Sequence, residues 1–184
     1  MIHKERIILG IDPGTTLMGY GVIAVKGRDT LLNTMGVIEL HKYTDPFLKL
    51  QKIYHRVSSL IEEYDPTEMA LEAPFLGKNA QSMLKLGRAQ GVALSAALNC
   101  NLPVFEYAPR KIKMSITGQG NASKEQVARM LQQIYKFKDM PKDLDATDGL
   151  AAALCHFYQF NPLLKQDKVK SWKAFINQNP NRIK

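Results

Sequence analysis

Residues 6–14 read RIILGIDPG, and this stretch indicates the centre of the fold. Arg6 to Ile11 is a short, nearly continuous apolar run that stops at Asp12-Pro13-Gly14. Such a run is typical of a central strand that is buried on both faces and ended by a Pro-Gly turn. It therefore predicts a strand at the centre of a sheet, with the carboxylate of Asp12 closing it.

The elements that follow this strand indicate the fold class. Residues 19–25 and 31–40 favour two further strands, which would form an antiparallel meander with the first. Apolar residues at helical spacing predict a helix over 46–64, and a fourth strand over 68–71 ends at Glu72. The rest is expected to hold a helix over about 79–98, a strand over 103–107, a short helix after Pro109, a helix capped by Ser123 and a last helix from about Asp145. A meander followed by crossover units predicts an α/β fold, a mixed sheet with helices on both faces.

Length and composition bound the class of protein. The 184 residues fit one domain with a sizeable core, and 45% of them are apolar. No apolar run approaches the roughly 20 residues that cross a bilayer, and residues 1–6 do not resemble a secretory signal, so we expect a cytoplasmic protein without a membrane partner. Cys100 and Cys155 are expected to be small buried residues. Basic residues dominate 161–184, which predicts a folded domain over 1–160 followed by a flexible basic C-terminal tail.

Four acids stand out against a basic background. The net charge is +8 and the sequence pI is about 9.5, which favours a polyanionic partner, nucleic acid above all. Asp12 and Glu72 each close a strand, and Asp145 and Asp148 lie three apart at the start of the last helix. Singly, each acid has a structural explanation as a turn former, a strand end or a helix cap. Together they are expected to converge, because the carboxyl ends of parallel strands and the adjoining helix start meet at one crevice.

A gathering of carboxylates has a chemical consequence. Such groups repel one another, and their pKa values rise unless a cation holds them. Hard oxygen ligands suit Mg²⁺ or Mn²⁺, and the sequence has no His/Cys cluster that favours a softer metal. Two such ions can activate a water and stabilise the leaving oxygen in phosphodiester hydrolysis. A basic protein with this crevice is therefore predicted to be a nuclease.

Three motifs resemble those of a known family. They are ILGIDPGTTLMGYGVI at 8–23, LEAPFLGKNAQSMLKLGRAQG at 71–91 and DLDATDGLAAALCH at 143–156. In this order and spacing they resemble the RuvC family of Holliday-junction resolvases, and the similarity covers about residues 6–160. The first motif alone is less specific, because actin-like ATPases carry a similar turn.

The resemblance implies a fold, an activity and partners. It implies a ribonuclease-H-like fold with a mixed five-stranded sheet, and a homodimer that cuts four-way junction DNA by paired symmetric nicks. The implied chemistry is hydrolysis with two Mg²⁺ per active site, for which Mn²⁺ substitutes, leaving 5′-phosphate and 3′-hydroxyl ends. DNA recombination and repair are the implied setting, and a branch-migration helicase complex (RuvA and RuvB) is the implied partner.

The resemblance also assigns roles to residues. The metal-binding catalytic acids of the family are matched by Asp12, Glu72, Asp145 and Asp148. Lys113 and Lys124 match basic residues that serve near the scissile phosphate, and Phe75 matches an aromatic placed against bases at the junction centre. Lys124 also follows the predicted cap Ser123, at a helix N-terminus that favours phosphate but opposes a lysine through the helix dipole. Further plausible phosphate contacts are Lys78, Lys85, Arg88, Arg110 and Lys111.

Several alternatives stay open at the level of sequence. The turn GIDPGTT also fits a sugar-kinase or actin-like ATPase, although the chain is short for two lobes. A structure-specific DNA-binding protein with a decayed site is a second alternative, and a ribonuclease-H-like nuclease acting on RNA or RNA–DNA hybrid is a third. Gly87 and Gly91, four apart in one helix, indicate close packing against either a dimer partner or the sheet. His156 is expected to be structural.

Overall fold

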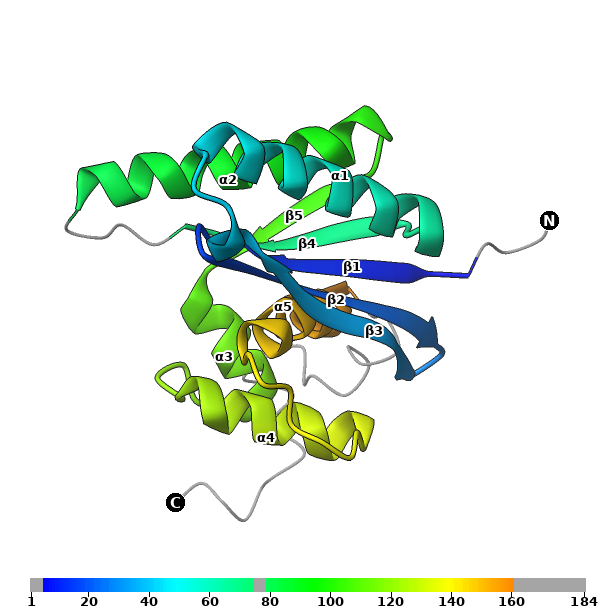
Figure 1. Ribbon diagram of the computed structural model, residues 1–184. Coiled ribbons are helices and arrows are strands. Elements are labelled where there is room, and N and C mark those ends of the chain that lie inside the picture. The colour runs from blue at the N-terminus through cyan, green and yellow to red at the C-terminus, as the bar shows by residue number, and fades with distance from the viewer. Residues whose placement is uncertain (1–4, 75–78, 161–184) are drawn as a thin grey trace, which may run out of the picture.

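The computed structural model describes residues 5–74 and 79–160, which build one sheet covered by helices (Figure 1). The strands are β1 (Ile7–Asp12), β2 (Leu17–Lys26), β3 (Asp29–Glu39), β4 (Glu68–Glu72) and β5 (Val104–Tyr107). The helices are η1 (Leu40–Lys42), α1 (Pro46–Tyr64), α2 (Ala80–Asn99), α3 (Pro109–Thr117), α4 (Lys124–Tyr135) and α5 (Asp145–Phe160). The order expected from the sequence is confirmed, except that the short 3-10 helix η1 was missed.

The sheet has the order β3-β2-β1-β4-β5, so the RIILGI strand lies at its centre. β1 pairs antiparallel with β2 and parallel with β4, and β5 extends the parallel half. β2 and β3 form a long antiparallel pair at the other edge. β1, β4 and β5 run in the same direction, so their C-terminal ends lie together at one end of the strands. We call this the carboxyl edge of the sheet, and Asp12 and Glu72 lie there.

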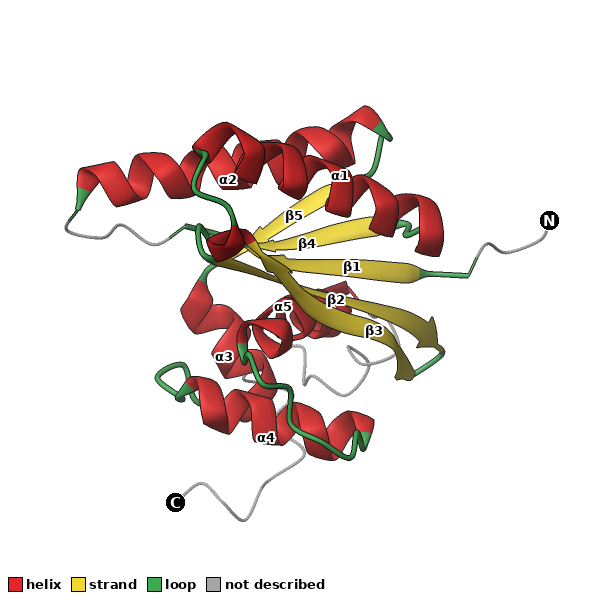
Figure 2. Ribbon diagram, in the orientation of Figure 1, coloured by secondary structure: helices red, strands yellow, loops and turns green. Residues whose placement is uncertain are grey.

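Helices cover both faces of the sheet, as Figure 2 shows. On one face, α1 and α2 pack on buried side chains that include Leu9, Ile11 and Met69. On the other face, α5 lies directly on the sheet, flanked by α3 and α4, in a core that includes Ile8 and Ile23. The alternation of core residues along β1 explains why its sequence reads as an unbroken apolar run, since both faces are buried.

Glycines let α5 approach the sheet more closely than side chains would allow. A Cβ added at Gly10 of β1 would lie 2.1 Å from the carbonyl oxygen of Gly149, and one at Gly19 of β2 would lie 1.8 Å from that of Asp145. A Cβ added at Gly21 would lie 2.5 Å from Cα of Leu150. A glycine inside a strand marks such a close backbone approach. The first turn of α5 is thereby fixed beside the end of β1.

Some smaller expectations can now be compared with the structure. Cys155 is buried as expected, but Cys100 is exposed at the end of α2, so that expectation was wrong for Cys100. His156 is structural, because it is fully buried and its Nδ1 lies 2.6 Å from the hydroxyl of Tyr107. Among the described helices, none combines the length and the apolarity needed to span a membrane.

Candidate active site

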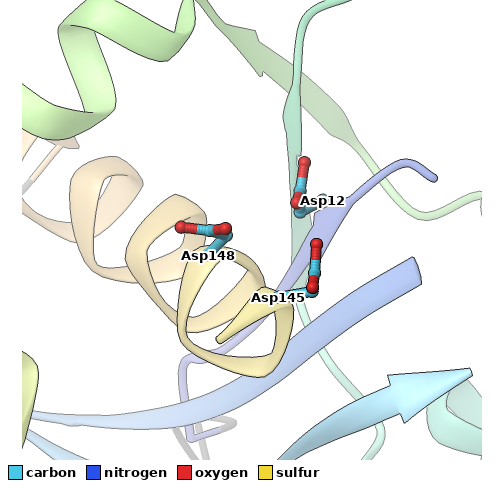
Figure 3. Close-up of side chains that lie close together, drawn as sticks. All are labelled: Asp12, Asp145 and Asp148. Atoms are coloured by element: carbon cyan, nitrogen blue, oxygen red, sulfur yellow. The ribbon is translucent and has the colours of Figure 1, made fainter. Parts of the chain in front are cut away.

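Three of the four predicted acids come together at the carboxyl edge of the sheet. Asp12, at the end of β1, and Asp145 and Asp148, in the first turn of α5, offer carboxylate oxygens that all lie within 4.8 Å of one another. Figure 3 shows the two helix carboxylates beside that of the strand. The spacing of three residues in α5 puts both acids on one side of the helix, as the sequence predicts.

The helix start does not need these carboxylates as caps. The backbone N–H groups of Ala146 and Thr147 donate to the carbonyl oxygens of Asp143 and Leu144, at 3.2 and 2.8 Å. The N–H of Asp148 also donates to Leu144, at 3.1 Å. Because the first turn is satisfied by backbone carbonyls, the carboxylates are available to face Asp12. This favours a functional over a capping explanation for the pair.

Glu72 lies near this cluster but is not a member of it. It ends β4, the parallel neighbour of β1, and its carboxylate is not part of the group within 4.8 Å. Burial is the main cause that raises the pKa of Glu72 to about 7, and the charge of Asp148 adds to it. Glu72, on the neighbouring strand, therefore lies close enough to the cluster for its charge and those of the aspartates to influence one another.

The gathered acids have unusual protonation behaviour. Burial, followed by the charges of Glu72 and Asp148, raises the pKa of Asp12 from 3.8 to about 8. Burial also raises the pKa of Asp148, although Lys124 opposes this shift. Carboxylates that are hard to ionise together are a strong site for a cation, since a bound cation removes the repulsion. The set of oxygen donors fits a hard divalent metal ion.

Lys124 lies against two of these acids. Its Nζ lies 2.6 Å from Oδ2 of Asp148 and 3.1 Å from Oδ1 of Asp145. Burial alone would lower the pKa of Lys124, but its hydrogen bond to Asp148 and the charges of both aspartates outweigh burial and raise it. Lys124 is the first residue of α4, held there by a capping box between Ser123 and Gln126.

The other basic residues predicted from the sequence have different surroundings. Lys113 of α3 is close enough that its charge lowers the pKa values of Glu72 and Asp148. Lys111 lies over the ring of Tyr107, 5.0 Å from its centroid, and Arg110 packs against Gly120. Phe75 and Lys78, together with the basic tail, lie outside the described residues.

The residues that bring the acids together were not predicted from the sequence. Gly10, Gly19 and Gly21 hold no functional atoms, but they allow α5 to lie against β1 and β2. The signal was present, because glycines inside two consecutive apolar strands are unfavourable unless something packs closely there.

A mixed five-stranded sheet with helices on both faces and acids at the carboxyl edge defines the ribonuclease-H-like class of fold. Comparison with known proteins narrows this class. The sequence profile of the family "Crossover junction endodeoxyribonuclease RuvC" matches residues 8–156, and the chain belongs to this family.

Individual relatives agree over nearly the whole chain. It is 60% identical to a crossover junction endodeoxyribonuclease RuvC of Cytophaga hutchinsonii, over 98% of this chain and 89% of that protein. The protein of the same name from Bacteroides fragilis is 59% identical, over 98% and 97% of the two chains. Among solved structures, Thermus thermophilus RuvC in complex with Holliday junction substrate superposes with a TM-score of 0.78 at 32% identity, covering 85% of this chain and 95% of that one.

Proposed function

We propose that this protein is a structure-specific endonuclease that resolves four-way DNA junctions by paired symmetric nicks, in DNA recombination and repair. The observation that carries the proposal is the cluster of Asp12, Asp145 and Asp148, with oxygens within 4.8 Å of one another, in a chain of the RuvC family. Its basic charge of +8 suits a DNA partner, and a DNA substrate implies a cytoplasmic location.

The acids are proposed to hold two Mg²⁺ ions per active site, with Mn²⁺ able to substitute. Asp12, Asp145 and Asp148 supply the central ligands, and Glu72 completes the set from β4. When bound, the ions would supply Lewis-acid activation of water and stabilisation of the departing 3′ oxygen, which leaves a 5′-phosphate. The raised pKa values of Asp12, about 8, and Glu72, about 7, support this assignment, because these residues gain most from a neutralising cation.

Lys124 is proposed to act on the scissile phosphate. Its ammonium is the positive charge that faces the carboxylates, 2.6 Å from Asp148. A positive group held at this point stabilises the negative charge that builds on the phosphate in the transition state. Lys113, whose charge already reaches Glu72, is proposed to assist from α3.

Further DNA contacts are proposed from the sequence. Phe75 is proposed to stack on bases at the junction centre and Lys78 to contact a phosphate beside it. Arg110 and Lys111, exposed on α3, are proposed to contact the backbone of the bound strand. Junction recognition by this surface fits a partner role for a branch-migration helicase complex, which delivers junctions to the nuclease.

A homodimer is proposed because paired nicks need two active sites. The exposed side of α2 supports it. Leu84 and Leu98 are 59% and 61% exposed there, and a Cβ added at Gly87 or Gly91 would meet nothing within 4 Å. Ala89, Ala93, Ala96 and Ala97 of α2 pack into the core, whereas Gly87 and Gly91 do not, so within the described residues nothing requires a glycine at these two positions. Gly87→Arg is expected to turn a dimer into a monomer in sedimentation analysis.

The proposed function is tested by cleavage of a synthetic four-way junction with Mg²⁺, beside a linear duplex and an RNA–DNA hybrid. Symmetric nicks near the crossover, in the junction alone, are expected. Asp12→Asn is expected to abolish cutting while junction binding is retained, because binding depends on surfaces outside the metal site. Cutting of the hybrid instead would assign the alternative ribonuclease-H-like activity, and ATP binding without cutting would assign the ATPase alternative.

A further inference from the structure

A cavity of about 320 Å³ lies between the β1–β2 loop and the first turns of α1 and α2, and it belongs to none of the roles above. We call it the anchor pocket. Its polar lining is Thr15, Thr16, Thr44, Lys49, Lys85 and Arg88, and its floor includes the apolar side chains of Leu50 and Ile53. The two helices lie side by side on the face of the sheet opposite α5 (Figure 1).

The charges of the anchor pocket are all of one sign. Lys49, Lys85 and Arg88 line it, and no acid does. Within residues 5–74 and 79–160, no ion pair is formed by any of the three. Nζ of Lys49 donates a 3.4 Å hydrogen bond to the carbonyl oxygen of Thr15. Three cations without an acid among the lining residues attract an anion.

The anchor pocket is fixed close to the acids by the β1–β2 loop. Thr15 follows Asp12 by three residues, so their Cα atoms are no more than about 11 Å apart. The loop is tight, because a Cβ at Gly14 would lie 1.6 Å from the carbonyl oxygen of Leu17. It is also tied down where the N–H of His41 donates to the carbonyl oxygen of Thr16, at 2.9 Å. One short segment thus positions both sites.

We propose that the anchor pocket binds a backbone phosphodiester of the cut DNA strand, one to three nucleotides from the scissile phosphate. Lys85 and Arg88 bind the phosphate oxygens, the threonine hydroxyls donate to them, and the apolar floor contacts the deoxyribose. The proposal rests on the proposed function for its substrate. A strand carries one phosphate for roughly every 3.4 Å of helix axis, so one held at the acids has another phosphate within reach of the loop.

The alternative source of the same chemistry is a free phosphate or nucleotide. The pocket favours the strand because Lys85 and Arg88 are exposed side chains at its rim, where they can meet a long polymer. Positioning a second phosphate restricts the strand at the acids, which orients the scissile bond. The anchor pocket is thus a positioning site and takes no part in the chemistry.

The test compares Lys85→Gln/Arg88→Gln with a matched double variant, Arg129→Gln/Lys138→Gln. The control removes the same two charges from exposed positions on α4 and just beyond it. Junction affinity is measured without divalent metal over a range of salt concentrations. The slope of log Kd against log [salt] is expected to fall by about 0.9 for the pocket variant, as for one lost phosphate contact, and to stay unchanged in the control.

Single phosphates are then replaced by uncharged methylphosphonates at three positions on each side of the cut site, or of the crossover if no cut occurs. In the wild-type protein and the control, one position is expected to weaken binding by roughly fivefold. In the pocket variant that same replacement is expected to leave junction affinity unchanged, because the charges of Lys85 and Arg88 that would contact this phosphate are already removed. Equal costs in both proteins at every position would overturn the proposal.

Two further outcomes separate this proposal from others. In the first, thymidine monophosphate raises the melting temperature of the wild type but not of the pocket variant, while each methylphosphonate weakens binding equally in both proteins. In that case the pocket binds a free nucleotide and the proposal is wrong. A wild type that binds junctions without cutting them refutes the proposed function. The effect of each methylphosphonate on junction affinity, compared between wild type and pocket variant, then still tests whether the anchor pocket binds a phosphate. A wild type that binds no DNA refutes both.

Discussion

The same three elements carry ionisable residues toward both of their ends, with opposite results. At one end of β1, β4 and α5 stand Arg6, Glu68 and His156; at the other end stand Asp12, Glu72 and Asp148. At the first end, Arg6 donates to Glu68, whose second oxygen lies 2.8 Å from Nε2 of His156. At the second end, the carboxylates of Asp12, Asp145 and Asp148 face one another, and Lys124 of α4 pairs with the two aspartates of α5.

The pKa values express this difference. Burial alone would raise the pKa of Glu68, but hydrogen bonds from His156 and Arg6 hold it below 4.5. Burial and like charges raise the pKa of Glu72, four residues later in the same strand, to about 7. The ionised groups around Glu68 therefore stabilise the fold. The carboxylates around Glu72 repel one another, and a bound metal ion would remove this repulsion.

The two glutamates of β4 make a matched pair for activity. Glu72→Gln is expected to lower junction cleavage at least about 10³-fold, because it removes a carboxylate from the metal site. Glu68→Gln is expected to leave single-turnover cleavage at 25 °C within a few-fold of wild type. Similar losses of cleavage in both variants would show that the glutamates of β4 affect cleavage only by stabilising the fold.

Gly10 lies midway between the two ends of β1, and its replacement is expected to lower both the stability of the fold and the cleavage activity. Gly10→Ala puts a Cβ 2.1 Å from the backbone of Gly149, so α5 must move off the sheet. We expect a loss of about 3 kcal/mol or more in the free energy of unfolding by urea, with loss of cleavage. Gly36→Ala is the control, because its added Cβ meets the hydroxyl end of Tyr20 instead of backbone. Equal losses would argue against close α5 packing.

Glu68→Gln is expected to destabilise the protein by about 2 kcal/mol at pH 7. It removes the charge that pairs with Arg6 and His156 in a part-buried setting. Urea unfolding measures this loss. Arg6→Gln should cost a similar amount, and the double variant less than the sum of the two, because the residues share one interaction. Additive losses would mean that the pair is not coupled.

The two ends are expected to respond to pH in opposite directions in the metal-free protein. Asp12 and Glu72 have folded pKa values of about 8 and about 7, above their ordinary values, so the folded state holds protons that the unfolded state releases. Their contribution to stability therefore falls as pH rises from about 4 to 8. The pKa of Glu68 is lowered, so its contribution is present above pH 4.5 and lost as pH falls through its folded pKa.

Melting temperatures across this range check the pH prediction. Asp12→Asn is expected to flatten the decline toward pH 8, and Glu68→Gln the decline below pH 4.5. Mg²⁺ is expected to raise the melting temperature most at high pH, with release of protons on binding. A wild-type curve without any decline toward pH 8 would contradict the assignment of repelling acids.

The smallest effect is expected from the helix cap beside Lys124. Ser123→Ala removes the capping box of α4 and is expected to cost about 1 kcal/mol of stability. Cleavage should fall only a few-fold, because Lys124 keeps its ion pairs with Asp145 and Asp148. Lys124→Ala should cost far more in cleavage than in stability. A cap variant as inactive as Lys124→Ala would mean that the cap itself orders the active site.

Local sequence was sufficient for most elements of the fold. The apolar run of β1, the helical spacing of 46–64 and the capping box at Ser123 each depend on neighbouring residues, and each was predicted correctly. The η1 turn, which is only three residues long, and the start of β2 at Leu17 were missed. The acids were found through their positions at the ends of elements, together with the resemblance of three motifs.

How these residues act together depends on contacts that form only when the chain folds. The glycines of β1 and β2 bring α5 into backbone contact, which sets the spacing of the acids and raises their pKa values. Likewise, Lys49, Lys85 and Arg88 belong to two helices, and only their packing forms a pocket. The physical reason is that helix spacing and turn chemistry act between neighbours in the chain, whereas burial and charge repulsion depend on distances between segments that the chain brings together only when it folds.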